Sequence, residues 1–212
     1  PFLQSRGITK LDYVFVSHAD QDHINGIRWL LNSSCDIEVG CLVMPEAGKG
    51  RTEYEELELA ASEQGAEVRY WKRGDRLVTG NFSVTCLYPE PGTDEAEKNA
   101  HSLVLSVRWK EFGALLTGDI GFREETLLTS YREAESQLSS SVLKAAHHGS
   151  GESSSQSFLD AVSPSVYIIS YGKGNPYGHP SPETVKRMEE AGGMIWSTAD
   201  SGAVRIYTDG EM

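Results

Sequence analysis

The chain is organised around a polar stretch that directly follows an apolar run, Ser17-His18-Ala19-Asp20-Gln21-Asp22-His23. The apolar residues 11–16 before it predict a buried strand, and residues 24–31 after it predict a helix. A turn between a strand and a helix can direct several side chains at one point, and imidazole nitrogen and carboxylate oxygen suit zinc, manganese or iron. The stretch therefore predicts a divalent-cation site, with a solvated polar loop as the simpler alternative.

The composition is that of an ordinary soluble globular protein. The 212 residues are 39% apolar and 24% charged, enough to bury the core of one domain, which we expect to span 1–212. No apolar run approaches the ~20 residues of a membrane span, and the start has no signal-peptide layout. The chain does not begin with Met. We therefore expect a soluble domain excised from a larger protein.

The charge balance restricts the ways in which the chain could bind nucleic acid. A formal net charge of -12 argues against binding by electrostatics alone, so a phosphate-bearing substrate would need bound metal ions and local cations. Cys35, Cys41 and Cys86 show no CxxC pairing and are interpreted as structural thiols, which disfavours disulfide or zinc-finger sites.

The remaining patterns predict strands interspersed with helices. Expected strands are 38–44, 67–71, 76–78, 82–88, 102–109, 114–117, 141–146, 166–171, 194–197 and 203–207, and expected helices are 53–64, 122–131, 155–162 and 182–191. The runs between 67 and 88, separated by turn signals, indicate a meander. Ser181 is the expected N-cap of the last helix, with Pro182 at its first position. Together these elements suggest an α/β fold with two sheets sandwiched between helices.

Three further clusters carry candidate ligands. Asp119 follows Gly118 at the end of a strand, where α/β sites usually lie, although it could instead cap the next helix. His147 and His148 also follow a strand. Adjacent side chains point in different directions, so one can bind metal while the other contacts substrate or donates a proton, and a structural histidine is the alternative for each. His179, in a turn before Pro180, would by itself be a surface residue.

Taken together, the clusters are more informative than any one of them. The candidate ligands are His18, Asp22, His23, Asp119, one of His147 and His148, and His179. This set suffices for two metal ions that share a bridging carboxylate, an arrangement that clamps the attacking and leaving oxygens in hydrolysis.

These motifs, in this order, resemble those of the metallo-β-lactamase superfamily. More narrowly, the chain from Phe2 to Thr208 is similar to the soluble nuclease-like domain of ComEC-type competence proteins, which take up transforming DNA. The resemblance implies an αββα four-layer sandwich with the metal site at one edge of two mixed sheets. It also implies a parent bacterial integral membrane protein with a channel domain, and a DNA partner that is single-stranded or one strand of a duplex.

The resemblance also implies roles for individual residues. His18 and His148 would hold a first divalent ion, and Asp22, His23 and His179 would hold a second. Asp119 would bridge the two ions. The ions would be Mn²⁺ or Zn²⁺, with Mg²⁺ as the alternative. Asp22, Asp119 and His147 would form the catalytic group that hydrolyses a phosphodiester. Asn99, Ser150 and Lys173 are weaker candidates for substrate contacts.

Two departures from the superfamily pattern stand out. Asp20 occupies a position where a histidine is common, and a carboxylate there favours manganese or magnesium over zinc, or weakens the first site. The strand pair that normally precedes the region matching Phe2 is missing from the sequence, so we expect the first sheet to lack those N-terminal strands.

Cations and aromatic residues near the clusters suggest a path for a polyanion. Tyr171 and Tyr177 could stack on bases, and the cations are Lys144, Lys173, Lys186 and Arg187, although each could equally be an ordinary surface residue. Three hypotheses remain open: a metal-dependent DNA nuclease, a hydrolase of a small phosphoester or other ester, and a metal-stabilised module without turnover. The sequence does not determine the oligomeric state.

Overall fold

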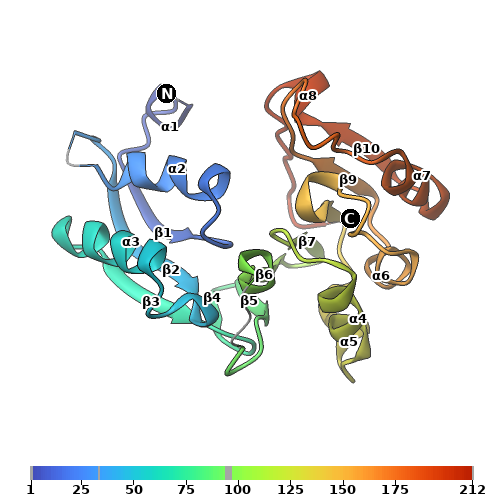
Figure 1. Cartoon of the computed structure of the whole chain (residues 1–212), viewed down its shortest axis with the longest axis horizontal. Helices are drawn as coiled ribbons and strands as arrows, with labels where there is room; N and C mark the ends of the chain where they lie inside the picture. Colours follow the sequence, from blue (N-terminus) through green and yellow to red (C-terminus); the bar gives the residue numbers. More distant parts are fainter. Residues whose placement is uncertain (1, 33, 94–96, 212) are drawn as a thin grey trace. The chain divides into compact units, whose positions relative to one another are not determined.

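The computed structural model describes residues 2–32, 34–93 and 97–211, and the chain divides into two compact units. Unit 1 comprises Pro1–Lys72 and Pro89–Leu103, and unit 2 comprises Arg73–Tyr88 and Val104–Met212 (Figure 1). Each unit has its own sheet and its own apolar core, so each is described by itself.

Unit 1 is built on a parallel three-stranded sheet with the order β1-β2-β3. Its elements are α1 (Phe2–Ser5), β1 (Lys10–Phe15), α2 (Gln21–Leu30), β2 (Glu38–Pro45), η1 (Glu46–Gly48), α3 (Thr52–Glu63), β3 (Glu67–Trp71) and η2 (Lys98–His101). Parallel neighbours need crossover connections, and α2 and α3 provide them. The core is apolar, with Ile24 of α2, Leu42 of β2 and Leu57 of α3 all at most 1% exposed.

Helix α2 begins at Gln21, three residues earlier than the sequence pattern predicts. Asp20 is the N-cap residue, and its carbonyl oxygen accepts the backbone N–H groups of His23 (2.9 Å) and Ile24 (3.0 Å). The early start places Asp22 and His23 in the first helical turn. An acidic residue there interacts favourably with the helix dipole.

Unit 2 is built on a seven-stranded mixed sheet with the order β10-β9-β8-β7-β6-β5-β4. Strands β4 to β7 are antiparallel, and β7 to β10 are parallel. The strands are β4 (Arg76–Thr79), β5 (Phe82–Tyr88), β6 (Val104–Trp109), β7 (Phe112–Leu116), β8 (Val142–Lys144), β9 (Val166–Ile169) and β10 (Met194–Ser197). The helices are α4 (Phe122–Ser130), α5 (Ala134–Leu138), η3 (Ala146–Gly149), α6 (Gln156–Val162), α7 (Pro182–Ala191) and α8 (Thr198–Ser201).

The expected α/β class, with its parallel and mixed strands, is confirmed, and Ser181 and Pro182 begin α7 as predicted. Two expectations were wrong. Residues 67–71 do not belong to a meander, because β3 pairs in parallel with β2 of unit 1. Residues 203–207 form no strand; instead, the side chains of Val204 and Ile206 line a cavity beside β9 and β10. Helix α5 was missed.

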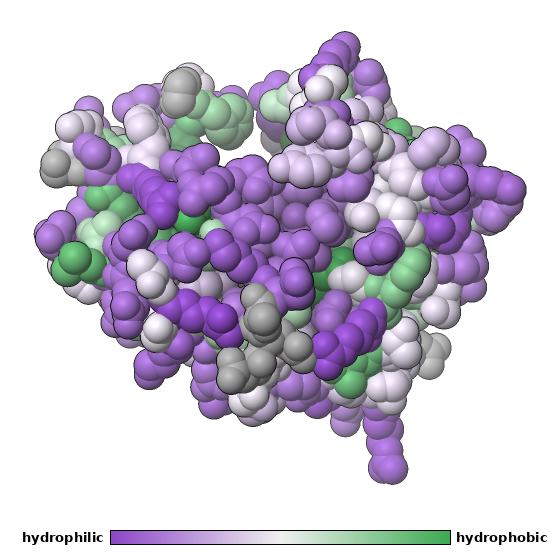
Figure 2. All heavy atoms as spheres, in the orientation of Figure 1, coloured by the Kyte–Doolittle hydropathy of each residue, from purple (hydrophilic) through white to green (hydrophobic). Residues whose placement is uncertain are grey.

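The surface is mainly polar, as the composition suggests. On the face drawn in Figure 2, hydrophilic residues predominate and apolar residues occur in small separate groups. Cys35, Cys41 and Cys86 are free thiols, in agreement with the sequence interpretation. Within 2–32, 34–93 and 97–211, no helix combines the length and apolar character that a membrane crossing requires.

Candidate functional site

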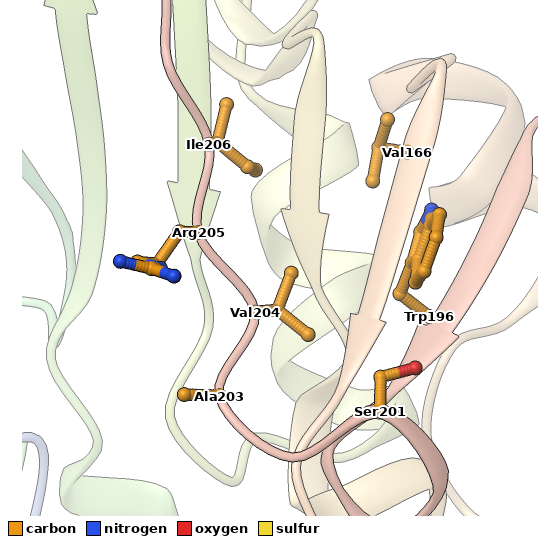
Figure 3. A pocket seen from close by; sticks show the side chains of 7 residues that line it. All are labelled: Val166, Trp196, Ser201, Ala203, Val204, Arg205 and Ile206. Atoms are coloured by element: carbon orange, nitrogen blue, oxygen red, sulfur yellow. The ribbon is translucent and has the colours of Figure 1, made fainter.

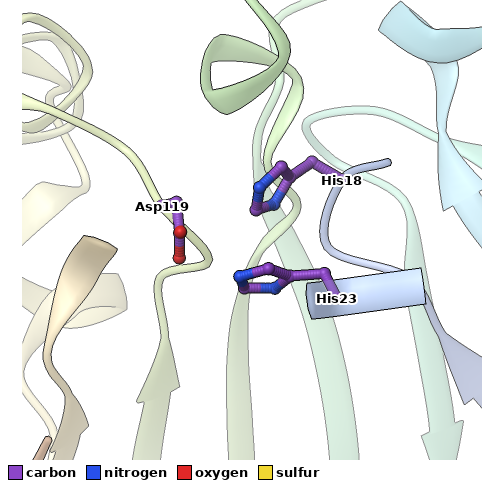
Figure 4. A group of neighbouring side chains, drawn as sticks. All are labelled: His18, His23 and Asp119. Atoms are coloured by element: carbon purple, nitrogen blue, oxygen red, sulfur yellow. The ribbon is translucent and has the colours of Figure 1, made fainter. Parts of the chain in front are cut away.

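In unit 1, the loop after β1 brings two imidazole rings together. The ring centroids of His18 and His23 lie 4.1 Å apart with 45° between the ring planes (Figure 4). The side chain of His18 is completely buried, whereas that of His23 is 14% exposed. The loop is anchored on both sides, because the N–H of Val16 donates to Val43 and the N–H of Leu103 donates to the carbonyl of Ser17 (2.8 Å).

Hydroxyl groups contact the same nitrogen on both rings. Ser17 Oγ lies 3.0 Å from Nδ1 of His23 and 3.3 Å from Nδ1 of His18, and Ser102 Oγ lies 3.4 Å from Nδ1 of His18. The Nε2 atoms face carboxylates instead, with 3.5 Å between His18 and Asp20 and 3.6 Å between His23 and Asp22. Both rings therefore direct Nε2 toward oxygen ligands.

Asp20 contacts more than one charged group. Its Oδ2 faces His18, while its Oδ1 lies 3.9 Å from Nζ of Lys98, which pairs more closely with Glu53 at 2.6 Å. The hydrogen bond with Glu53 raises the pKa of Lys98, and that with Lys98 lowers the pKa of Glu53. A cation is thus already held beside Asp20. Asn99, a predicted substrate contact, follows Lys98 in η2, and its carbonyl accepts the N–H of Ser102.

In unit 2, Asp119 lies in the loop after β7, and Figure 4 also draws this side chain. It is 4% exposed, and its two oxygens have different partners: Lys144 Nζ is 3.5 Å from Oδ1, and His148 Nε2 is 3.2 Å from Oδ2. Gly118 has a φ of 53°, a conformation that glycine adopts readily. The N-cap of α4 is Gly121, so the alternative helix-capping role of Asp119 does not apply.

His148 is held in one tautomer by the backbone. Its Nδ1 lies 2.6 Å from the carbonyl oxygen of Ser170, which can only accept, so Nδ1 carries the proton and Nε2 faces Asp119. In the protonated ring Nε2 also carries a proton, and its hydrogen bond to Asp119 raises the pKa of His148 against the opposing effect of burial. Both His147 (φ 46°) and His148 (φ 53°) have left-handed backbone conformations, which are uncommon for residues other than glycine and often mark functional sites.

His179 lies near the same histidines. Its ring centroid is 5.4 Å from that of His147, and burial, followed by the charges of His147 and His148, lowers its pKa. Its Nδ1 is buried and has no hydrogen-bond partner among the described residues. The side chain of Asn175 closes the loop by accepting the N–H of His179 (3.0 Å) and donating to its carbonyl (2.6 Å).

The tip of that loop presents an aromatic ring to solvent. Tyr177 is 79% exposed and stacks on His179 with 6.0 Å between the centroids and 19° between the planes. Lys173, in the same loop, is also exposed. Both residues are therefore accessible to a substrate that reaches His179.

Other predicted substrate contacts have internal partners. Ser150 is buried, and its hydroxyl accepts the N–H of Glu152. The guanidinium of Arg187 donates to the carbonyls of Gly151, Ser153 and Ser154. Three other residues of the suggested polyanion path also have partners. Lys144 contacts Asp119, Lys186 contacts Glu190, and the Tyr171 backbone contacts the Thr198 hydroxyl. Arg187 and Ser150 thus stabilise the loop after His148.

A cavity of about 360 Å³ lies elsewhere in unit 2 (Figure 3). It is lined by Val166, Trp196, Ser201, Ala203, Val204, Arg205 and Ile206. None of these residues is a candidate ligand, and most of them are apolar. The cavity therefore does not mark the candidate site.

The donor atoms suit a divalent cation. Histidine nitrogens and carboxylates are ligands for zinc and manganese, and a ligating histidine normally donates its second N–H to a neighbouring oxygen. His148 meets this condition through Ser170, and its Nε2 faces a carboxylate. Ser102 belongs to the Asn99-x-x-Ser102 motif that is part of the family resemblance, but the motif did not predict its contact with His18. The sequence contains no local signal for the role of Ser170, whereas the place of Ser17 next to His18 was a signal that went unused.

Comparison with known proteins places these motifs in a family. The chain is 34% identical over 209 residues to ComE operon protein 3 of Bacillus subtilis (97% of this chain, 26% of that protein) and 30% identical over 206 residues to Recombination protein 2 of Haemophilus influenzae (97% and 23%). It is 29% identical over 212 residues to Competence protein ComA of Neisseria gonorrhoeae (97% and 26%). The chain thus spans about a quarter of the length of these relatives.

Solved structures show the same fold. The diiron β-hydroxylase CmlA from Streptomyces venezuelae matches with a TM-score of 0.58 at 15% identity, over 88% of this chain and 44% of that one. The metallo-beta-lactamase fold protein YhfI from Bacillus subtilis matches with a TM-score of 0.54 at 13% identity, over 88% and 74%. The family model of the metallo-beta-lactamase superfamily matches residues 1–173, which include the ligand motifs up to His148. The predicted fold is thereby confirmed, and the chain belongs to the metallo-β-lactamase superfamily.

Proposed function

We propose that this chain is a metal-dependent phosphodiesterase that cleaves DNA during competence-type uptake. The observation that carries the proposal is the set of imidazoles whose Nδ1 atoms contact oxygen partners, with Nε2 directed at a carboxylate, in His18, His23 and His148. This is the arrangement in which a histidine ligates a cation. The similarity to ComE operon protein 3 and to Competence protein ComA supports DNA as the substrate class.

We assign the ligands by donor type and by the family pattern. His18 and His148 would hold one ion, Asp22, His23 and His179 a second, and Asp119 would bridge them. Mn²⁺ and Zn²⁺ suit these ligands, with Mg²⁺ as the alternative. The buried Nδ1 of His179, which has no hydrogen-bond partner among the described residues, supports its inclusion. The position of Asp20 between His18 and Lys98 makes it the least secure of the predicted ligands.

When bound, divalent cations supply Lewis-acid stabilisation and lower the pKa of water. The residues of the chain would supply charge compensation, proton donation and substrate contacts. Lys144 offsets the negative charge of Asp119, and His147, whose ring centroid is 5.4 Å from that of His179, would donate a proton to the leaving oxygen. Tyr177 and Lys173 would contact a base and a phosphate of a single strand.

The remaining functional statements concern the longer protein. We propose that the chain is one domain of a bacterial membrane protein that also contains a channel, because the relatives are about four times as long and one of them is named a competence protein. The DNA partner would be single-stranded or one strand of a duplex.

Incubation of linear single-stranded DNA with the chain and added Mn²⁺ tests the proposal. We expect degradation that is abolished in His23→Ala and Asp119→Ala and retained in Lys10→Ala, an exposed control that pairs with Glu38 at 2.7 Å. Turnover of only a small chromogenic phosphodiester would favour a small-ester hydrolase. No bound Mn²⁺ or Zn²⁺ after dialysis, with no hydrolysis, would leave a non-catalytic module.

A further inference from the structure

The hydroxyl of Ser17 lies between two candidate ligands of the same kind. Its Oγ is 3.0 Å from Nδ1 of His23 and 3.3 Å from Nδ1 of His18. We propose that Ser17 is a positioning residue that sets the tautomer of both histidines, so that each presents the lone pair of Nε2 to a divalent cation. The proposal rests on the proposed function for the cation, whereas the tautomers can be tested without it.

The number of protons on the hydroxyl and on the two rings restricts the hydrogen bonds that Ser17 can form. A hydroxyl has one proton and two lone pairs, and a neutral imidazole has one protonated and one unprotonated nitrogen. If Ser17 donated to Nδ1 of either ring, the proton of that ring would be on Nε2, which could not then bind metal. If both Nδ1–H groups donate to Ser17 Oγ, both Nε2 atoms retain their lone pairs. Ser17 is partly exposed, so its own proton can point to water.

The surroundings keep the Ser17 hydroxyl in place. The carbonyl of Ser17 accepts the N–H of Leu103 at 2.8 Å, and the preceding residue, Val16, donates its N–H to β2. The loop backbone is therefore fixed on both sides of the side chain. The short separation of the two rings, 4.1 Å between centroids, lets one oxygen reach both Nδ1 atoms.

The two histidines differ in how much they depend on Ser17. His18 has a second hydroxyl, Ser102 Oγ, at 3.4 Å from Nδ1, in addition to Ser17 Oγ at 3.3 Å. Loss of the Ser17 hydroxyl should thus change His23 more than His18. Loss of the Ser102 hydroxyl should change His18, which Ser102 contacts.

The first experiment determines the tautomers of His18 and His23 in the metal-free chain. Long-range ¹H–¹⁵N correlation spectra of the ¹⁵N-labelled chain, at a pH where the imidazoles are neutral, distinguish Nδ1–H from Nε2–H. We expect Nδ1–H for both histidines in the wild type and in Ser17→Thr, a shift of His23 toward Nε2–H in Ser17→Ala, and a change at His18 in Ser102→Ala. Nε2–H on both rings of the wild type would overturn the proposal, whether or not any variant folds.

The second experiment measures Zn²⁺ binding by calorimetry on the same samples. We expect Ser17→Ala to bind Zn²⁺ roughly 10–100-fold more weakly and Ser17→Thr to bind like the wild type, since loss of a partner to a ligating histidine typically has this effect. Unchanged tautomers and affinity in a folded Ser17→Ala chain would also overturn the proposal. Nδ1–H tautomers in a wild-type chain that binds no cation would contradict the proposed function instead.

Discussion

The Nδ1 atom of His148 lies 2.6 Å from the backbone carbonyl oxygen of Ser170, 22 residues further along the chain. His148 follows β8 and Ser170 follows β9, and the two strands are parallel neighbours, so their carboxyl ends meet at one edge of the sheet. Asp119, after β7, lies at the same edge. The sheet of unit 2 therefore both places His148 beside Asp119 and fixes which nitrogen faces it.

Replacement of Asp20 by histidine should change the metal preference. Asp20 is 3.5 Å from Nε2 of His18, and an imidazole is a softer donor than a carboxylate. We expect the ratio of Zn²⁺ to Mn²⁺ affinity to rise in Asp20→His, as measured by calorimetry with each metal. Asp20→Asn, which keeps the shape and removes the charge, is the control. An equal ratio in all three chains would show that Asp20 does not contact a bound ion.

Gly149 should tolerate no side chain. Its φ is +81°, and an added Cβ would lie 2.7 Å from Cβ of Pro180. We expect Gly149→Ala to lower the free energy of unfolding by roughly 2–5 kcal/mol, from backbone strain and overpacking together. Gly151→Ala is the matched control, because its Cβ would come no nearer than 3.4 Å to Ser181 Oγ. Urea denaturation measures both, and equal losses would refute the prediction.

Glu125 should make the stability depend on pH. It is fully buried and accepts the N–H groups of Ser154 and Ser155, yet burial raises its pKa. A carboxyl group whose pKa is higher in the folded than in the unfolded chain stabilises most below its unfolded pKa, and this contribution is lost as the pH rises through the folded pKa. The wild type should therefore lose stability relative to Glu125→Gln on going from acidic to neutral pH.

Urea unfolding of both chains at several pH values measures the effect of Glu125. Only the difference between the chains matters, since other groups titrate in both. A difference that does not change with pH, or one that favours the wild type at higher pH, would contradict the prediction.

Tyr177 should contribute to the binding of single-stranded DNA. Its ring is 79% exposed, and base stacking on an aromatic ring typically contributes about 1–3 kcal/mol. We expect Tyr177→Ala to raise KM for single-stranded DNA by the corresponding factor with little change in kcat, and Tyr177→Phe to behave like the wild type. Turnover of a small chromogenic phosphodiester should be unaffected. Equal losses on both substrates would show that Tyr177 acts by supporting His179, on which it stacks.

The sequence by itself determined the family and most of the elements that carry the candidate ligands. His18, Asp119 and His148 each follow an apolar strand directly, and that information is local, because a strand and the loop after it are adjacent in the chain. The same locality allowed the start of α7 at Pro182 to be predicted.

Only the tertiary structure decided the partners of those ligands. Ser102 contacts His18 across 84 residues and Ser170 contacts His148 across 22, and no local pattern records such pairs. The assignment of β3 to the sheet of unit 1, and the absence of a strand at 203–207, depend on which backbone is available for pairing. Ligand identity is thus a property of short segments, whereas the tautomer and orientation of each ligand depend on hydrogen bonds that exist only after the chain has folded.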